Sequence, residues 1–207
     1  VILKVSQRVD VKNLINEVAL DAKKAGLVAD RAYRHQLGFI KIMLGGLSDG
    51  QTLRLHYWDQ DICNVQEDIH SHRESFISEV LSGCFEESIY ALKNGDKFRK
   101  FIYSADQNGE CCEATFDGLY NVELTSQEKL RSGDLYARSK ESLHRVSKVE
   151  KGTVTLSIWD GNSSTATVLK DINGCVESCN LVSPVSAFEV FKIISKIKDE
   201  FFKYDFS

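Results

Sequence analysis

The chain has 207 residues, 27% of them charged, with a formal net charge of -4 and a pI near 5.8. Its lysines and arginines are spread through the sequence, which excludes the concentrated basic surface that nucleic-acid binding requires. The longest apolar runs are a few residues long, whereas a membrane-spanning helix needs roughly 20, so we expect no membrane partner.

The first predicted element is an amphipathic helix over residues 10–25. Its apolar side chains recur at helical spacing, Asp10 is placed to cap the helix and Gly26 to end it. We therefore assign residues 1–36 to an N-terminal helical region. The apolar positions are Val11, Leu14, Ile15, Val18, Ala22 and Ala25.

Short apolar or alternating segments follow and predict β-strands. Asn-Gly and Asp-Gly pairs separate many of them, and these pairs favour tight turns between antiparallel strands because they adopt positive φ at low cost. An all-β sandwich or a closed barrel over residues 37–182 is therefore the expected fold. The predicted strands are 37–44, 52–58, 75–81, 84–92, 97–104, 119–124, 134–138, 143–148, 152–159 and 164–170.

The C-terminal region, residues 183–207, is predicted to be helical from 184 to 204. Ser183 and Pro184 suit a helix start, and an aromatic and aliphatic stripe follows at helical spacing. We expect this stripe to pack on the protein's own sheet, with a partner-binding helix as the alternative, and the whole chain to form one domain. The stripe comprises Phe188, Phe191, Ile194, Ile197 and Phe201.

The cysteines do not form a disulfide or zinc pattern. The adjacent pair Cys111 and Cys112, and the wider pair Cys175 and Cys179, are not CxxC ligand sets, and a chain of this size needs no disulfides. We expect all six, which include Cys63 and Cys84, to be reduced. No signal peptide is recognisable, so the expected location is the cytoplasm.

Three of the five histidines suggest a metal site. His70 and His72 are one residue apart, so an extended strand would project both side chains from one face, with backbones roughly 6.5–7 Å apart. His144, from a distant strand, is a third ligand that would leave positions open for water, dioxygen or substrate. Imidazole suits iron, zinc, copper and nickel, and structural histidines are the alternative interpretation. His35 and His56 have no second histidine at a ligand spacing and are expected to be packed side chains.

Two motifs around these histidines resemble a known family. The segment from His70 to Gly83 resembles the first metal motif of the cupin superfamily, and residues 133–146 resemble the second. Within the cupins the chain is most similar to thiol dioxygenases of the cysteine dioxygenase type, and the similarity covers residues 37–160. The residues that carry the second motif are Gly133, Tyr136, Leu143, His144, Arg145 and Val146, and a preceding strand ends at Trp58.

The resemblance implies a cupin double-stranded β-helix (jelly-roll) barrel with a mononuclear Fe(II) held by His70, His72 and His144. Zinc, nickel and manganese remain alternatives as the metal. The implied partners are dioxygen and a small anionic substrate. Glu74 shares the strand parity of His70 and His72, so it is an alternative metal ligand, although we expect it to support the ligands or to lie at the surface.

Departures from the family pattern bear on the chemistry. Ser75 or Phe76 stands where animal cysteine dioxygenases have a cysteine, and Ser157 and Trp159 stand at the family's histidine and tyrosine. Trp159 and Tyr136 are therefore candidate catalytic residues, with a core aromatic as the alternative for Tyr136.

The family's substrate-binding arginine has two candidate counterparts, Lys41 and Arg54. A lysine would hold an anion as a point charge, without the two-pronged hydrogen bonding of arginine, so the substrate could differ from that of the family. Cys84 is expected to be a small buried hydrophobe and Arg145 a structural residue.

The leading hypothesis is a cytoplasmic Fe(II)-dependent cupin oxygenase with a small anionic, possibly thiol, substrate. The runner-up is a non-catalytic metal- or ligand-binding cupin that acts as a sensor or regulatory module. A metal-dependent isomerase or hydrolase is the third hypothesis, since one fold hosts many functions.

Overall fold

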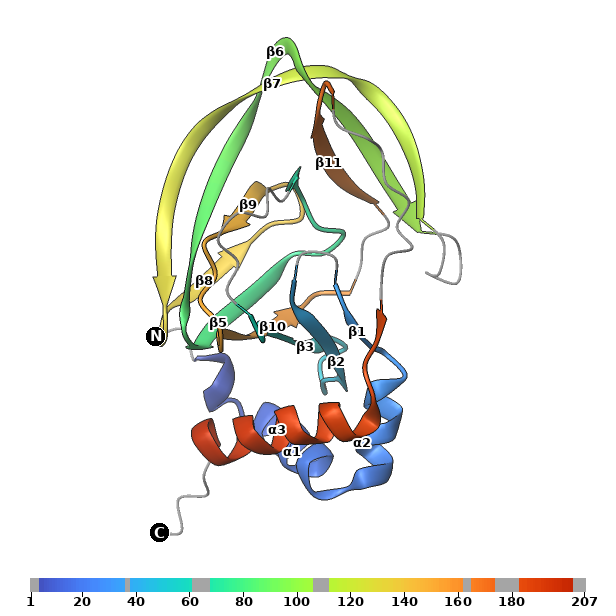
Figure 1. Ribbon diagram of the computed structural model, residues 1–207, viewed down its shortest axis with the longest axis vertical. Coiled ribbons are helices and arrows are strands. Elements are labelled where there is room, and N and C mark those ends of the chain that lie inside the picture. Colours follow the sequence, from blue (N-terminus) through green and yellow to red (C-terminus); the bar gives the residue numbers. More distant parts are fainter. Residues whose placement is uncertain are drawn as a thin grey trace.

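The protein is mainly β, with helices near both ends of the chain. The computed structural model describes residues 4–35, 38–60, 68–105, 112–161, 165–173 and 183–202. Figure 1 shows the helices below a curved sheet and a long β-ribbon that arches over the opposite side. The predicted fold class, a mainly β barrel with N-terminal and C-terminal helices, is confirmed.

Among the described residues all strand pairings are antiparallel, and they build two sheets. The first sheet contains β1 (Ala32–Arg34), β2 (Ile40–Gly46), β3 (Thr52–Tyr57), β5 (Phe76–Ser82), β8 (Leu135–Arg138), β10 (Val154–Trp159) and β12 (Ser183–Pro184). The second contains β4 (Ile69–His70), β6 (Cys84–Ala105), β7 (Cys112–Arg131), β9 (Leu143–Ser147) and β11 (Thr165–Asp171).

The strand order explains how the second sheet curls. The first sheet runs β12-β1-β2-β3-β10-β5-β8 and the second runs β11-β4-β9-β6-β7. Because β11 pairs with the far half of β6 as well as with β4, the strands β11, β4, β9 and β6 are hydrogen-bonded in a closed ring. His70 ends β4 and His144 lies on β9, which are neighbouring strands of this ring.

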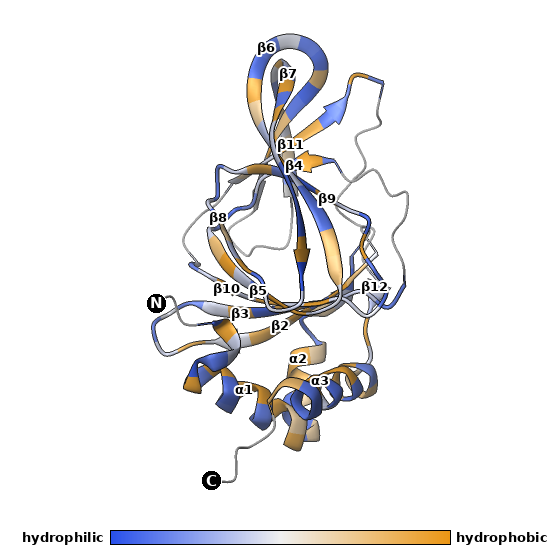
Figure 2. Ribbon diagram, turned by 90° about the vertical axis from the view of Figure 1, so that its left-hand side faces the viewer, coloured by the Kyte–Doolittle hydropathy of each residue, from blue (hydrophilic) through white to orange (hydrophobic). Residues whose placement is uncertain are grey.

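The helices cover one face of the first sheet and so decide which side chains face the barrel interior. The helical elements are η1 (Val5–Gln7), α1 (Val9–Leu20), α2 (Ala22–Ala29) and α3 (Ala187–Phe201). Ile40, Ile42 and Leu55 are buried against them in the main core, and Figure 2 shows the helices under β2 and β3. Side chains alternate along a strand, so Lys41 and His56 point to the opposite face.

The predicted single helix over residues 10–25 is wrong in two respects, because it is interrupted at Asp21 and it does not end at residue 25. It divides into α1 and α2, because Asp21 takes an extended conformation and its carboxylate accepts hydrogen bonds from the backbone of Lys23 and Lys24. This is a helix N-cap, which starts a new helix. Gly26 lies inside α2 and does not end it. The predicted N-terminal helical region also contains β1.

The C-terminal helix is shorter than predicted, because Ser186 caps it and residues 183 and 184 form β12. Ile194 and Ile197 of the predicted stripe are buried, and Phe191 and Phe201 are partly buried against the same core. Phe188 is 76% exposed, so its expected core position is wrong.

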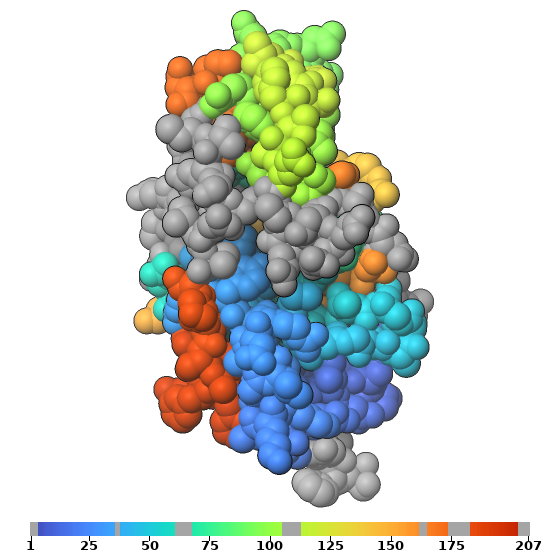
Figure 3. Space-filling model, turned by 90° about the vertical axis from the view of Figure 1, so that its right-hand side faces the viewer, coloured from blue at the N-terminus to red at the C-terminus, as the bar shows by residue number. Residues whose placement is uncertain are grey.

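The largest error in the strand prediction concerns the ribbon. The predicted strands 84–92 and 97–104 form one strand, β6, and the predicted strand 119–124 is part of the 20-residue β7. Asn94 and Gly95 do not form the expected turn, because both halves of β6 pair with β7 around an irregularity there. In Figure 3 the ribbon forms the end of the molecule opposite the helices.

Most other strand predictions agree with the structure to within a few residues. The expected turn at Asp49 and Gly50 joins β2 to β3, whereas Gly45 and Gly46 belong to β2 itself. Cys84 is free and buried. Several predictions lie outside the described residues, namely the turn at Asn108 and Gly109 and the state of Cys63, Cys111, Cys175 and Cys179.

Gly83 connects β5 of the first sheet to β6 of the second. It lies between β5 and β6 with φ +75°, and an added Cβ would come within 2.2 Å of the Thr153 hydroxyl oxygen. The chain can turn here only without a side chain, since the left-handed conformation and the close contact both favour glycine.

Candidate metal centre

The three predicted ligands converge. His70 is the last residue of β4 and pairs directly with His144 of β9. The candidate ligand atoms of His70, His72 and His144 lie within 4.8 Å of one another. His72 lies beyond the end of β4, so the expectation that one strand carries both His70 and His72 is wrong. Ser71 keeps the chain in place, because its backbone N–H donates to Thr167 and its hydroxyl accepts from the Thr167 N–H.

Two of the imidazoles are oriented by acceptors on their far side. Nδ1 of His144 lies 2.6 Å from a carboxylate oxygen of Glu87, and Nδ1 of His70 lies 3.1 Å from the backbone carbonyl of Asp68. A carboxylate and a carbonyl accept but do not donate, so each Nδ1 carries the proton. The Nε2 lone pairs of His70 and His144 are thereby left for a ligand.

The remaining nitrogen geometry suits a bound ion. Nε2 of His72 lies 2.8 Å from Nε2 of His144. Two nitrogens about 2.1 Å from one ion, on adjacent coordination positions, are about 3 Å apart. The three ring centroids are 4.7 to 4.9 Å apart, so the imidazoles surround one point. The cluster can therefore hold a metal ion, and its donor set does not by itself select one metal.

His70 and His72 are held in the neutral form that metal binding requires. Burial, followed by the nearby His144, lowers the pKa of His70 to about 3. The same two causes, in that order, lower the pKa of His72 well below its usual value. Neutral imidazole is the ligating form, so the site does not have to lose these protons at neutral pH before it binds an ion.

Glu87 was not predicted as a site residue, although it is 1% exposed and holds His144. Its carboxylate also accepts hydrogen bonds from Nε (3.1 Å) and Nη2 of Arg138. Burial alone would raise the pKa of Glu87, but the hydrogen bonds from His144 and Arg138 lower it overall. The sequence did contain a signal for Glu87. It lies two residues from Phe85 and from Ile89, so on an extended strand its carboxylate would project from the same face as these apolar side chains.

The other predicted site residues lie on the interior face of the first sheet. Lys41 of β2 pairs with His56 of β3, and Arg54 pairs with Ser157 of β10. Lys41 Nζ lies 5.4 Å from the centroid of the Tyr33 ring. Burial, followed by the charge of Lys41, lowers the pKa of His56 well below its usual value. The Lys41 charge therefore acts on the barrel interior.

Arg54 and Trp159 lie next to the histidine cluster. The Arg54 guanidinium lies 4.2 Å from the Trp159 ring centroid, and that ring meets the His72 ring edge-on with centroids 5.1 Å apart. Glu74 forms an ion pair with Arg54 and does not belong to the three-histidine group, which fits the expected supporting role. Arg54 Nε and Trp159 Nε1 are buried with no hydrogen-bond partner within the described chain.

Tyr136 and Ser157 form a separate polar row across β8, β5 and β10. Ser157 donates a hydrogen bond of 2.8 Å to Ser78, and Ser78 is paired with Tyr136 across β5 and β8. Burial raises the pKa of Tyr136, so its phenol keeps its proton at neutral pH. Phe76 contacts the rings of both Tyr136 and His72. Tyr136 thus packs against the site through Phe76.

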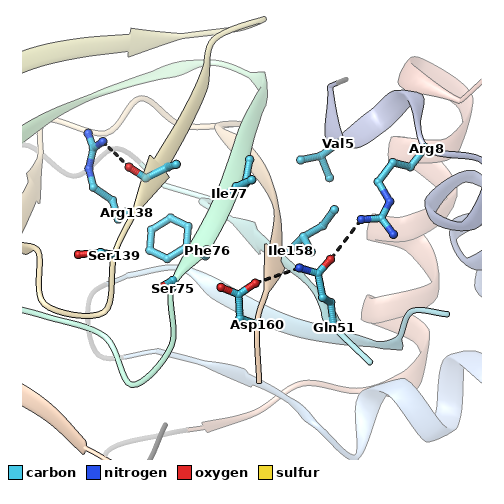
Figure 4. A pocket seen from close by; sticks show the side chains of 11 residues that line it. Val5, Arg8, Gln51, Ser75, Phe76, Ile77, Arg138, Ser139, Ile158 and Asp160 are labelled. Atoms are coloured by element: carbon cyan, nitrogen blue, oxygen red, sulfur yellow. Dashed lines mark hydrogen bonds between the residues drawn. The ribbon is translucent and has the colours of Figure 1, made fainter. Parts of the chain in front are cut away.

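A hollow of about 360 Å³ lies next to Phe76 and Arg138, and no histidine is among the residues that line it. Figure 4 shows Gln51 between Arg8 and Asp160 on one side of the hollow, with Phe76 and Arg138 on the other. Each of these polar groups already has a partner within the protein. Through Phe76 and Arg138 the hollow adjoins the residues that support His72 and His144.

No family model and no curated protein matches this sequence. Among solved structures, it resembles KdgF from Halomonas sp. (13% identity, TM-score 0.34, 68% of this chain and 88% of that one). It also resembles a chain from the DMSP lyase structures of RdDddP and RnDddQII (15%, 0.33, 60% and 48%). A third is hydroxypropylphosphonic acid epoxidase from S. wedmorenis (9%, 0.33, 63% and 56%).

The chain spans about half the length of the DMSP lyase chain that it matches, 48%. Among the described helices, none is long and apolar enough to cross a membrane.

Proposed function

We propose that this protein is a metal-dependent enzyme of the cupin type, an Fe(II) dioxygenase similar to thiol dioxygenases that acts on a small anionic substrate. The observation that carries the proposal is the convergence of His70, His72 and His144, with the Nε2 atoms of His72 and His144 facing each other at 2.8 Å. Three protein ligands on one side of an ion are the arrangement of a catalytic site, because they leave open positions.

Iron(II), when bound, would supply open positions at which substrate and dioxygen react. The chain's own residues prepare the site. Glu87 and the Asp68 carbonyl hold the protons of His144 and His70 on Nδ1 and fix the ring orientations. Phe76 and Trp159 are stacked with centroids 4.4 Å apart beside His72 and make that side of the site apolar. In this proposal Lys41 and Arg54 attract the substrate anion.

A metal-dependent isomerase or hydrolase on the same three histidines is the second candidate. It is favoured by Ser157 and Trp159, which replace the histidine and tyrosine of thiol dioxygenases. Ser157 is 1% exposed and its hydroxyl donates to Ser78, so it does not replace the imidazole that thiol dioxygenases have at this position.

Metal content and oxygen uptake test the proposal. Protein purified without added metal is assayed for bound metals, loaded with iron, and offered small thiols and diketones in an oxygen electrode. Uptake with at least one of them is expected. An iron-loaded protein that consumes no oxygen would reject the dioxygenase and leave the non-redox candidates.

A pair of variants tests the ligand set. His144→Ala is expected to lose its metal, whereas His35→Phe, which changes a histidine outside the cluster, is expected to retain it. Metal stoichiometry after gel filtration is the measurement, with circular dichroism to confirm folding. A His144→Ala protein with full metal content would remove His144 from the ligand set.

A further inference from the structure

The cations on the interior face of the first sheet are not equivalent. Arg54 has a carboxylate partner, because its Nη2 pairs with Glu74, although its Nε has no acceptor within the described chain. Lys41 is partly buried, and within the described residues it makes no ion pair with a carboxylate; its nearest aromatic contact is the Tyr33 ring. A partly buried ammonium without a counter-ion costs free energy unless an anion accompanies it. Lys41 is therefore the interior position that lacks an anion.

The neighbours of Lys41 place its side chain on the interior face of the first sheet. Ile40 and Ile42 on either side of it are 1% and 0% exposed and pack on the helices, so Lys41 projects from the other face. On that face it is paired with Tyr33 of β1 and with His56 of β3. Arg54 and Trp159 lie on the same face, and the Trp159 ring contacts His72.

A second acceptor position lies beside the metal ligands. Trp159 is 4% exposed, and its Nε1 is buried without a hydrogen-bond acceptor within the described chain. Nε of Arg54 is likewise buried without an acceptor. The two side chains are stacked, and Trp159 contacts His72. Buried donors without acceptors are rare because each costs free energy, so an oxygen atom of a ligand would satisfy them.

The two positions are separate but close. Lys41 pairs with His56 and Arg54 pairs with Met43, so Lys41 and Arg54 are diagonal neighbours on the same face of β2 and β3. Diagonal neighbours in an antiparallel pair have backbones about 7–8 Å apart. Two acidic groups at the ends of one short chain can therefore reach both positions.

We propose that the barrel interior binds a small dicarboxylate, with one carboxylate at Arg54 Nε and Trp159 Nε1 beside His72 and the other at Lys41 Nζ. This inference rests on the proposed function, because it takes the interior next to the three histidines as the active site. It makes Lys41 the residue that determines specificity, since a monocarboxylate would satisfy Arg54 and Trp159 but leave Lys41 without its anion.

Calorimetric titration of the zinc-loaded protein tests the proposal without turnover. Succinate and glutarate are compared with butyrate and valerate, which have the same chain lengths and one acid group fewer. The diacids are expected to bind about 10-fold tighter or more, the effect of one charge-assisted contact. Lys41→Met is expected to weaken the diacids more than the monocarboxylates and so abolish this preference, and Lys41→Arg to retain most of it. Lys192→Met, at an exposed lysine of α3, is the matched control.

Three outcomes would overturn the proposal. One is a Lys41→Met protein, folded by circular dichroism, that still prefers diacids. Another is equal weakening of diacids and monoacids, which would assign Lys41 a non-specific electrostatic role. The third is inorganic phosphate that binds as tightly as succinate with the same dependence on Lys41, which would indicate a single dianion site.

The metal content of the same samples separates this inference from the proposed function. Full zinc occupancy without a diacid preference rejects the dicarboxylate alone. A protein that retains no metal rejects the proposed function, and titration of that metal-free protein still measures the contribution of Lys41.

Discussion

Nδ1 of His144 and the buried carboxylate of Glu87 lie 2.6 Å apart, on neighbouring strands β9 and β6. Arg138 holds the same carboxylate from its other side. The pair fixes both the tautomer and the direction of the His144 ring, so a residue that is not itself in the three-histidine group sets the geometry of the site.

Replacing Glu87 with glutamine is expected to weaken metal binding by about 10- to 100-fold, because His144 loses its charged acceptor and the ring is no longer held in one orientation. The dissociation constant, measured by competition with a chelator, reports the change. Glu86→Gln is the matched control, since Glu86 is the adjacent residue and pairs with Lys148 at the surface. Equal affinities in the two variants would show that Glu87 serves stability alone.

Glu74→Gln is expected to keep the wild-type metal stoichiometry, because Glu74 is paired with Arg54 and lies outside the histidine group. The cost should appear in the free energy of unfolding, by about 1–3 kcal/mol, since a largely buried guanidinium loses its charged partner. Metal analysis and urea unfolding measure the two effects. Loss of metal in a folded Glu74→Gln protein would return Glu74 to the set of ligands.

The sequence was sufficient for the three histidines because their motifs are local. His70 and His72 are one residue apart, and His144 lies in the segment from Leu143 to Val146, so no knowledge of distant contacts was needed to name them. Glu87 was missed because its role depends on strand pairing. It acts on His144 across the β6 and β9 pairing, 57 residues away, and only its inward parity was visible in the sequence.

The ribbon formed by β6 and β7 shows where prediction of the fold from local sequence patterns failed. Asn94 and Gly95 favour a turn locally, but the strand continues because the residues on both sides of them find the same partner, β7. The division between α1 and α2, in contrast, arises from a local interaction. Asp21 is a local cap signal in the middle of an apolar pattern, and periodicity alone concealed it. Tertiary pairing overrode a local signal in the first case, and a local signal overrode the periodicity in the second.

The metal-free protein is expected to lose stability as the pH falls from about 6.5 towards 3. The folded-state pKa of His70, about 3, lies below the unfolded value of about 6.5. Between these values the unfolded chain binds a proton that the folded chain does not, so stability decreases as pH decreases, by at most about 1.4 kcal/mol per pH unit for each such histidine. Burial, then His144, lowers the pKa of His72, which adds in the same direction.

Urea unfolding of the metal-free protein between pH 7 and pH 4 measures this dependence. His70→Gln should reduce the slope of stability against pH, because glutamine does not titrate. Lys192→Met, a surface change on α3, should leave the slope unaltered. A His70→Gln protein with the wild-type slope would contradict the assignment of the effect to His70.

Gly83→Ala is expected to destabilise the protein far more than Gly152→Ala. Both glycines have a left-handed backbone, with φ of +75° and +85°. A Cβ at Gly83 would lie 2.2 Å from the Thr153 hydroxyl oxygen and 2.7 Å from its Cα, whereas a Cβ at Gly152 would meet nothing within 4 Å. Backbone strain alone predicts a loss of about 1–2 kcal/mol at Gly152. Overpacking at Gly83 adds about 1–3 kcal/mol. Comparison of the two free energies of unfolding isolates the contact with Thr153, and equal losses would show that the passage from β5 to β6 adjusts to a side chain.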